Sequence, residues 1–383
     1  MGHLVDGVWH TGWYEPDAQG AFQRPPTRFR NRPVEAVAGR YHLYASWACP
    51  WAHRTLITRA LRGLTGAVSL TIVAPLMGDN GWSLRVEDPD PIGGAQHLRE
   101  IYLRTDPAYT GRVTVPILWD RETNTILNNE SREVMRIFDV DFAPLTQHPL
   151  EPSLAPPELV DEIDRVLDAI YEPINNGVYR AGFAATQSAY DTAVHELFTA
   201  LAYWDTVLGD QPFLCGTRMT EADIALFTTL LRFDLVYYAH FKCNVKRLRD
   251  HANLWRFTRQ MYQHPGIRPT CHLDDIKRHY YWSQPTVNPT RIIPRGPALE
   301  AELAAALESP ARTTRSARAT SPGILGNSGR ADHSGHSGHS GRSQRQPAPD
   351  QMQSHEQDHR ADEGDEDRAR ESWKWRVPAG LTE

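Results

Sequence analysis

The fold is decided by the stretch YHLYASWACPWAH, which spans residues 41–53. Residues 41–46 predict a β-strand, and residues 50–61 predict a helix that Pro50 opens at its first turn. Cys49 lies between the two, directly before the helix. A helix N-terminus favours a thiolate through its free N–H groups and its dipole, and the thiolate is the nucleophilic form of cysteine. This turn therefore predicts a reactive thiol at Cys49.

Strand and helix signals alternate on the C-terminal side of this turn. Strands are predicted at residues 69–74, 115–119 and 125–127, and a helix at residues 130–138. The order β-α-β followed by β-β-α is the thioredoxin-like arrangement. The long insert between Pro75 and Arg112 is an addition to that fold.

Beyond the proline-rich segment Glu151–Pro157 the pattern becomes helical. Apolar residues recur at helical spacing, and helices are predicted at residues 159–170, 187–208, 220–240 and 253–263. The sequence Thr220-Glu-Ala-Asp223 matches a capping box, and Met219 and Ile224 occupy the positions of a hydrophobic staple around it. These residues indicate a structural role at the start of a helix.

The predicted fold class is α/β plus all-α. Residues 1–150 should form an N-terminal arm and a thioredoxin-like domain, and residues 151–297 an all-helical domain. Residues 298–383 are predicted to form a disordered tail, because large apolar residues are almost absent between about residues 309 and 370. Its repeat with His333, His336 and His339 leaves two interpretations open, a weak metal site or a solvated flexible segment.

The composition limits the partners and the compartment. A mild net charge of −6 gives no reason to expect nucleic acid or an anionic membrane as a partner. No apolar stretch approaches the roughly 20 residues of a membrane helix, and the N-terminus lacks a signal-peptide pattern. The four cysteines are far apart, which argues against a disulfide framework and favours the cytoplasm. Structural roles are expected for three of them: Cys215, Cys243 and Cys271.

The reactive cysteine is a monothiol. Thioredoxin-type motifs carry a second cysteine three residues on, where this chain has Ala52. A mixed disulfide on Cys49 must therefore be resolved by an external thiol, for which glutathione is the obvious candidate. His53 and Arg54 lie about one turn into the helix and are expected to add positive potential near the sulfur.

Two further features predict a site for the tripeptide glutathione. Val115-Pro116 opens a strand where thioredoxin-like folds carry a cis proline, which presents the Val115 backbone for pairing with an extended peptide. Glu130 and Ser131 begin the next helix. The helix start and the Ser131 hydroxyl can hold the γ-glutamyl carboxylate, and Glu130 can accept its ammonium group.

With these motifs in view, the sequence resembles the glutathionyl-hydroquinone reductases, the omega-like Xi class of glutathione transferases. The resemblance spans about residues 25–297. It is carried by eleven motifs: Arg40–Tyr44, Cys49–Ile57, Gly81-Trp82, Gly111–Asp120, Asn129–Ser131, Asn176–Phe183, Thr220–Ile224, His264–Ile267, Ile276–Tyr281, Asn288-Pro289 and Pro294–Pro297.

The resemblance implies roles for single residues. It implies Cys49 as the nucleophile and Tyr179 and Tyr280 as residues that face the quinol. The implied glutathione contacts are Trp82, Arg112, Val115, Glu130 and Ser131. It also implies a homodimer through the helical domain and no metal cofactor. Arg112 has a physical reason as well, because its guanidinium can pair with the glycyl carboxylate.

The chain departs from the family pattern at two places near the acceptor pocket. Leu84 stands where the family tends to have an aromatic residue, and Ser283-Gln284 stands where a Ser-His pair is usual.

The predicted activity is the glutathione-dependent reduction of glutathionyl-hydroquinones through a Cys49–glutathione mixed disulfide. Two alternatives are kept. An omega-like or glutaredoxin-like thiol transferase would use the same cysteine on mixed disulfides, and a non-catalytic scaffold would keep only the shape. A conventional conjugating transferase fits less well, because a cysteine in that place would trap the tripeptide.

Overall fold

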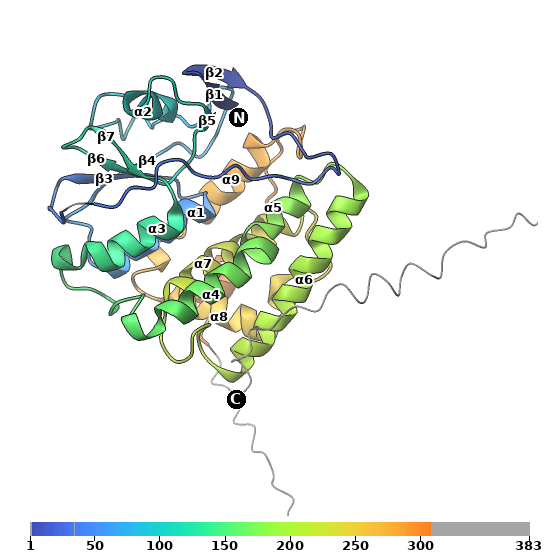
Figure 1. The fold of residues 1–383 in the computed structure, drawn as a ribbon. Helices are drawn as coiled ribbons and strands as arrows, with labels where there is room; N and C mark the ends of the chain where they lie inside the picture. The colour runs from blue at the N-terminus through green and yellow to red at the C-terminus, as the bar shows by residue number, and fades with distance from the viewer. Residues whose placement is uncertain (1, 34, 308–383) are drawn as a thin grey trace, which may run out of the picture. The chain divides into compact units, whose positions relative to one another are not determined.

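The structure is a computed structural model that describes residues 2–33 and 35–307. Its N-terminal half is built on a four-stranded sheet in the order β4-β3-β6-β7 (Figure 1). The strands are β3 (Tyr41–Ala45), β4 (Ser69–Ile72), β6 (Ile117–Asp120) and β7 (Thr125–Asn128). β3 runs parallel to β4 and antiparallel to β6, and β6 runs antiparallel to β7.

The helices of this half complete the predicted arrangement. They are α1 (Pro50–Leu61), α2 (Leu98–Thr105) and α3 (Ser131–Arg136). α1 is the crossover that a parallel pair such as β3 and β4 requires, and it has the bounds predicted from the sequence. α2 lies in the insert, where no helix was predicted. The thioredoxin-like fold is thereby confirmed.

A second, smaller sheet ties the N-terminal arm to the insert. It has the order β2-β1-β5, formed by β1 (Gly2–Val5), β2 (Val8–Thr11) and β5 (Gly111–Arg112). The β1–β2 turn is Asp6-Gly7, with positive φ at both residues (46° and 80°), as a two-residue hairpin turn requires. None of these three strands was predicted.

The rest of the arm crosses from one half of the structure to the other. The backbone carbonyl of Gly20 accepts a hydrogen bond from the Ala185 amide in the helical half. Farther along, Asn31 donates to Leu127 of β7. Figure 1 shows this dark blue segment passing beside α5 and α6 before it enters β3. The arm therefore contacts both halves of the structure.

The second half is helical, as predicted. Its helices are α4 (Val160–Ile170), α5 (Gly177–Gly182), α6 (Gln187–Asp210), α7 (Glu221–Arg232), α8 (Ala252–Gln263), α9 (Leu273–Ser283) and α10 (Glu300–Ala304). All twelve residues of α7 are buried, so α7 is the central helix. A single helix was predicted over residues 220–240. Instead, α7 ends at Arg232 and a wider π-helical turn covers Phe233–Tyr237.

Each half has its own hydrophobic core, and the core of the helical half corrects one prediction. A disordered tail was expected from residue 298, but Leu299 and Leu303 are buried in the helical core. α10 carries Leu303 there, and Arg259 donates to the Ala305 carbonyl directly beyond it. The chain is therefore packed up to this point. The predicted tail beyond residue 307, with its histidine repeat, lies outside the described residues.

Within residues 2–33 and 35–307, no helix has both the length and the apolar character needed to cross a membrane.

The start of α7 gives a test of stability. The Asp223 carboxylate accepts hydrogen bonds from the Thr220 amide (2.8 Å), the Thr220 hydroxyl (2.8 Å) and the Leu214 amide (2.7 Å), so the predicted capping box is present. Asp223→Ala leaves two buried amides without partners. We expect it to lower the free energy of unfolding by about 2–4 kcal/mol in urea titrations.

The matched control is Asp210→Ala at the exposed end of α6, which should change the free energy of unfolding by less than about 0.5 kcal/mol. Equal effects of the two substitutions would contradict the structural role of Asp223.

Candidate active site

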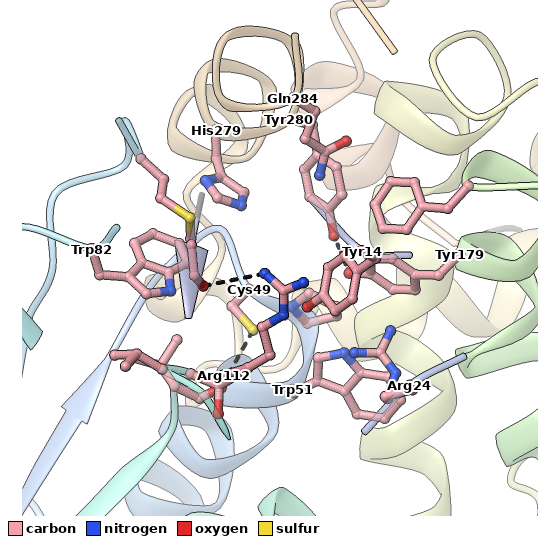
Figure 2. A pocket seen from close by; sticks show the side chains of 17 residues that line it. Tyr14, Arg24, Cys49, Trp51, Trp82, Arg112, Tyr179, His279, Tyr280 and Gln284 are labelled. Carbon is pink, nitrogen blue, oxygen red and sulfur yellow. Dashed lines mark hydrogen bonds between the residues drawn. The ribbon is translucent and has the colours of Figure 1, made fainter. Parts of the chain in front are cut away.

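A cleft of about 680 Å³, its open mouth included, lies at the amino end of α1. Five segments that are far apart in the sequence supply its walls (Figure 2). They are the arm (Gly2, Tyr14, Arg24), the start of α1 (Cys49, Pro50, Trp51), the insert (Met77, Trp82), residues 112–115, and the helical half (Tyr179, Phe183, His279, Tyr280, Gln284). The helical half and the arm thus supply about half of the residues that line the cleft.

A second cavity of about 540 Å³ adjoins the first. It reaches Pro116 and the start of α3, at Glu130 and Ser131. Six residues line both cavities: Tyr14, Arg24, Trp51, Arg112, Thr114 and Val115. The two cavities therefore share a wall, and together they connect Cys49 with Glu130 and Ser131.

Cys49 occupies the N-cap position of α1 in extended conformation (φ −76°, ψ 122°). The side chain is half-buried, and its sulfur lies 3.7 Å from the carbonyl oxygen of Val115. Figure 2 shows it in the middle of the cleft. Cys49 therefore lies at the helix start, as predicted, and lines the cleft.

Opposing influences act on the Cys49 thiol. Burial raises its pKa and outweighs the rest. The pKa is lowered by hydrogen bonds from the Ala52 and Trp51 amides and by the charges of Arg232 and Arg24. The predicted effect of the helix start is therefore present, but it is smaller than the effect of burial. The two arginines come from segments that the sequence did not connect with Cys49.

The expectation of positive charge on His53 is wrong. This side chain is fully buried, and burial lowers its pKa well below the usual value, so the ring is neutral. Its Nε2 is hydrogen-bonded to the Thr270 hydroxyl at 2.8 Å. Arg54 keeps its charge, although burial lowers its pKa to about 10, and it interacts electrostatically with Cys49.

The Val115-Pro116 peptide is cis, as predicted. The Val115 carbonyl faces the Cys49 sulfur. In the part of the chain that the structure describes, no acceptor is assigned to the Val115 amide. Val115 therefore lines both cavities, and its carbonyl lies beside the Cys49 sulfur.

Glu130 and Ser131 lie together at the start of α3. Glu130 is the N-cap residue, and its carboxylate accepts hydrogen bonds from the Arg132 amide (3.3 Å) and the Thr27 hydroxyl of the arm (3.0 Å). The Ser131 hydroxyl lies 3.5 Å from the same carboxylate. This end of the second cavity carries a fixed negative charge beside an amide-rich helix start.

Arg112 lines both cavities, but its terminal nitrogens are engaged by the arm. They donate to the carbonyls of Gly2 (3.3 Å), Gly12 (3.2 Å) and Trp13 (2.6 Å), and the guanidinium lies over the Tyr14 ring at 4.3 Å. Arg112 thus positions the arm against the cleft, a role that the sequence did not suggest.

Tyr179 and Tyr280 meet at the cleft wall, with their hydroxyl oxygens 2.5 Å apart. A third hydroxyl, that of Tyr237, lies 3.0 Å from Tyr280. Burial raises the pKa of Tyr179 and Tyr280 well above the usual value, so both phenols are neutral and can donate. The sequence predicted Tyr179 and Tyr280 but not Tyr237, which reaches them from the π-helical turn after α7.

Trp82 lines the opposite side of the cleft. Its indole is stacked on the His279 ring with centroids 4.7 Å apart and planes 14° apart (Figure 2). His279 is held by a hydrogen bond from Nδ1 to the Pro75 carbonyl (2.9 Å), and burial lowers its pKa to about 4. His279 was not predicted, although it stands beside Tyr280 in a quoted motif.

Arg24 is the most prominent residue that the sequence did not reveal. Its guanidinium lies over the rings of Tyr179 (4.7 Å) and Trp51 (4.9 Å), and its Nε donates to Asn176 at 2.8 Å. The buried Nη2 has no hydrogen-bond partner among the described residues. No local pattern distinguishes Arg24 from other arginines of the arm, so only the folded structure identifies it.

Comparisons with known proteins identify the class. The family models of the glutathione S-transferase N-terminal and C-terminal domains match residues 48–140 and 187–260. A Xi class glutathione transferase from Natrialba magadii superposes with a TM-score of 0.74 at 50% identity, over 80% of this chain and 95% of that one. The fold and these matches therefore define a glutathione transferase.

Curated relatives narrow the class to one family. The glutathionyl-hydroquinone reductase PcpF of Sphingobium chlorophenolicum is 47% identical over 78% of this chain and 97% of its own length. YqjG of Escherichia coli, also a glutathionyl-hydroquinone reductase, is 46% identical over 78% and 95%. Its glutathione-bound structure superposes with a TM-score of 0.69 over 77% of this chain and 96% of that one. The chain belongs to the glutathionyl-hydroquinone reductases, the Xi-class glutathione transferases, and is an enzyme of that family.

Selective alkylation tests the geometry of the cleft. Near neutral pH, iodoacetamide should modify Cys49 before the other cysteines, because Cys215 and Cys243 are buried. Burial also raises the pKa of Cys215 and Cys271 to about 12, and that of Cys243 still further. Peptide mass spectrometry measures the order. The control is Cys49→Ser, which should remain unlabelled on the same timescale; earlier labelling of any other cysteine would contradict the assignment.

Proposed function

We propose that the enzyme reduces glutathionyl-hydroquinones to hydroquinones with glutathione as the reductant. The function that the names of PcpF and YqjG state supports this proposal. The observation that carries it is the pairing of one accessible thiol, Cys49, with donor hydroxyls on the facing wall, those of Tyr179 and Tyr280. A thiol alone would be equally compatible with any thiol transferase. Phenolic hydrogen-bond donors beside it favour a substrate that carries a hydroxylated ring.

The adjoining cavities suit the glutathionyl part of the substrate. The γ-glutamyl group would lie at the start of α3, with its carboxylate on Ser131 and the helix amides and its ammonium on Glu130. The cysteinyl backbone would pair with Val115, which brings the substrate sulfur to Cys49. The glycyl end would reach Trp82 and Arg112. The side-chain bonds of Glu130 to Thr27 and of Arg112 to the arm suggest that the arm adjusts when glutathione binds.

The hydroquinone ring would occupy the part of the cleft that Trp51, Tyr179 and Tyr280 line. The ring centroids of Trp51 and Tyr179 are 6.5 Å apart with planes 28° apart, and the Arg24 guanidinium lies over both rings. The neutral hydroxyls of Tyr179 and Tyr280 can donate a hydrogen bond to a ring oxygen. This pocket offers an apolar wall and a polar end, which is what a small phenolic ring requires.

In the first step the Cys49 thiolate attacks the thioether sulfur of the substrate. A sulfur–sulfur bond forms, the sulfur–carbon bond breaks, and its electron pair stays with the ring. Hydrogen bonds from Tyr179 and Tyr280 to the ring oxygen favour a keto-like form in which the ring carbon has already taken up a proton, so that hydroquinone departs as a stabilised enolate. The product on the enzyme is a Cys49–glutathione mixed disulfide.

In the second step a free glutathione thiolate attacks the glutathionyl sulfur of the mixed disulfide. Glutathione disulfide leaves and the Cys49 thiolate is regenerated. The two electrons that reduce the ring carbon come from two glutathionyl sulfurs, which end as the disulfide. The reaction therefore balances with glutathione as the reductant.

Replacement of the nucleophile should abolish turnover. With Cys49→Ala, we expect no release of hydroquinone above the uncatalysed rate when a glutathionyl-hydroquinone and glutathione are followed by chromatography. Circular dichroism serves as the control for folding. Turnover near that of the unsubstituted enzyme would contradict the scheme.

The tyrosines separate this function from that of a general thiol transferase. Tyr280→Phe should lower the rate of hydroquinone release by roughly 10²-fold, because a donor to the ring oxygen is lost. The same variant should reduce a glutathione mixed disulfide at the normal rate, since that reaction releases no ring carbon.

The matched control is Tyr190→Phe, whose hydroxyl bonds to the Lys242 carbonyl on the surface and should leave both rates unchanged. Equal losses in both reactions for Tyr280→Phe would favour the general thiol transferase instead.

A further inference from the structure

Arg232 ends α7 and is fully buried beneath the active-site turn. Its Nε donates to the Ala48 carbonyl (2.8 Å) and its Nη2 to the Trp47 carbonyl (2.9 Å), the two residues directly before Cys49. Its Nη1 bonds to the Thr228 carbonyl at 2.6 Å and lies 3.2 Å from His53 Nδ1. A residue of the central helix of the helical half thus holds the turn that carries the nucleophile.

Among the residues that the structure describes, none forms an ion pair with this guanidinium. Within residues 2–33 and 35–307, no carboxylate lies within 4.0 Å of it. Its neighbours are three carbonyls and the neutral His53 ring. Arginine does not release its proton in a protein, and a buried charge is costly unless an opposite charge or several hydrogen bonds compensate it. The carbonyl dipoles compensate Arg232 in part, so a nearby anion would be strongly favoured.

The charge of Arg232 acts on the groups of the cleft. It lowers the pKa of Cys49, and likewise that of Tyr237 and Tyr280. It has the same effect on Cys271, His53 and His279. Of these groups, Cys49 is the one whose ionised form the reaction uses.

The same side chain fixes the geometry of the turn. A peptide unit is planar, so its C=O and N–H groups point in opposite directions. Because the Ala48 carbonyl is turned toward Arg232, the Cys49 amide is turned away from it. The two carbonyls that could repel a thiolate are likewise directed at the guanidinium. The orientation of the residue before the helix is therefore set from α7.

We propose that Arg232 is a positioning residue, which acts as the counter-ion of the Cys49 thiolate and holds the Trp47-Ala48 backbone in the orientation that exposes the sulfur. The inference rests on the proposed function in taking Cys49 as the nucleophile. It adds that the reactivity of this thiol depends on the helical half.

Other groups face Cys49 and must be kept constant in a test. They are Arg24 from the arm, Arg54 on α1, Tyr179 on α5 and Tyr237 after α7. Substitution at position 232 removes one charge and leaves these four in place. Arg59 offers a matched control, because this half-buried arginine of α1 also donates only to carbonyls, those of Val68 (2.8 Å) and Thr65 (3.0 Å).

The test is the pH profile of Cys49 alkylation by iodoacetamide in the full chain, with folding checked by circular dichroism. Arg232→Gln and Arg232→Met should move the midpoint upward by at least about one pH unit, which makes alkylation about tenfold slower below the midpoint. At high pH their rates should approach that of the unsubstituted protein. Arg232→Lys, which keeps the charge, should move the midpoint much less, and Arg59→Gln not at all.

An unchanged midpoint in a folded Arg232→Gln or Arg232→Met variant would overturn the proposal. If the chain folds only with a cation at position 232, the proposal also fails, because the charge then serves stability instead of the thiol. Alkylation requires no hydroquinone, so the outcome is independent of whether the proposed substrate is correct.

Discussion

The proposed reaction depends on one constraint, that the partly buried sulfur of Cys49 can carry a negative charge. Burial opposes the thiolate of Cys49, and the chain compensates with amides of α1 and with positive charge from outside the thioredoxin-like half. Arg24 comes from the arm and Arg232 from α7. Neither half of the structure alone contains all the groups that lower the pKa of Cys49.

The cleft, too, is built from both halves of the structure. The thioredoxin-like half presents the sulfur, the Val115 backbone and the start of α3, which suit a tripeptide. The helical half presents Tyr179, Tyr237 and Tyr280, which suit a phenolic ring. The arm crosses both halves and lines both cavities through Tyr14 and Arg24. The proposed reaction, which separates a ring from a tripeptide, would thereby take place in a site whose two ends come from different halves.

Local patterns predicted what depends on local physics. The bounds of α1 follow from Pro50 and the apolar periodicity behind it, and the capping box at Thr220 depends on four consecutive residues. Val115-Pro116 and Tyr179 with Tyr280 were reached through motifs and the family resemblance. In these cases the sequence neighbourhood alone, or its similarity to a known family, carries the necessary information.

The remaining features depend on contacts between distant segments. His53 is neutral because it is completely buried, and no sequence pattern reveals this burial. Its ring contacts Thr270 and Arg232 of α7, which are distant in the sequence. The strands of the β1–β2 hairpin have only four residues each, too few for a clear periodic pattern. Arg24 becomes part of the cleft only because the folded arm brings it to Tyr179 of α5. Leu299 and Leu303 extend the helical core, but two apolar residues at one short helix are too few to stand out against the polar composition that follows. Tyr237 follows a change of helix type that periodicity does not show.

The central claim is that the substrate's glutathionyl group is transferred to Cys49 before a second thiol acts. The direct measurement is a single turnover with excess enzyme and a glutathionyl-hydroquinone, without added glutathione, followed by intact mass and peptide mass spectrometry. The proposed mechanism predicts one hydroquinone released for each enzyme molecule that gains one glutathione on Cys49, and loss of that adduct when glutathione is added. Release of hydroquinone without an adduct, or an adduct on another cysteine, would contradict it.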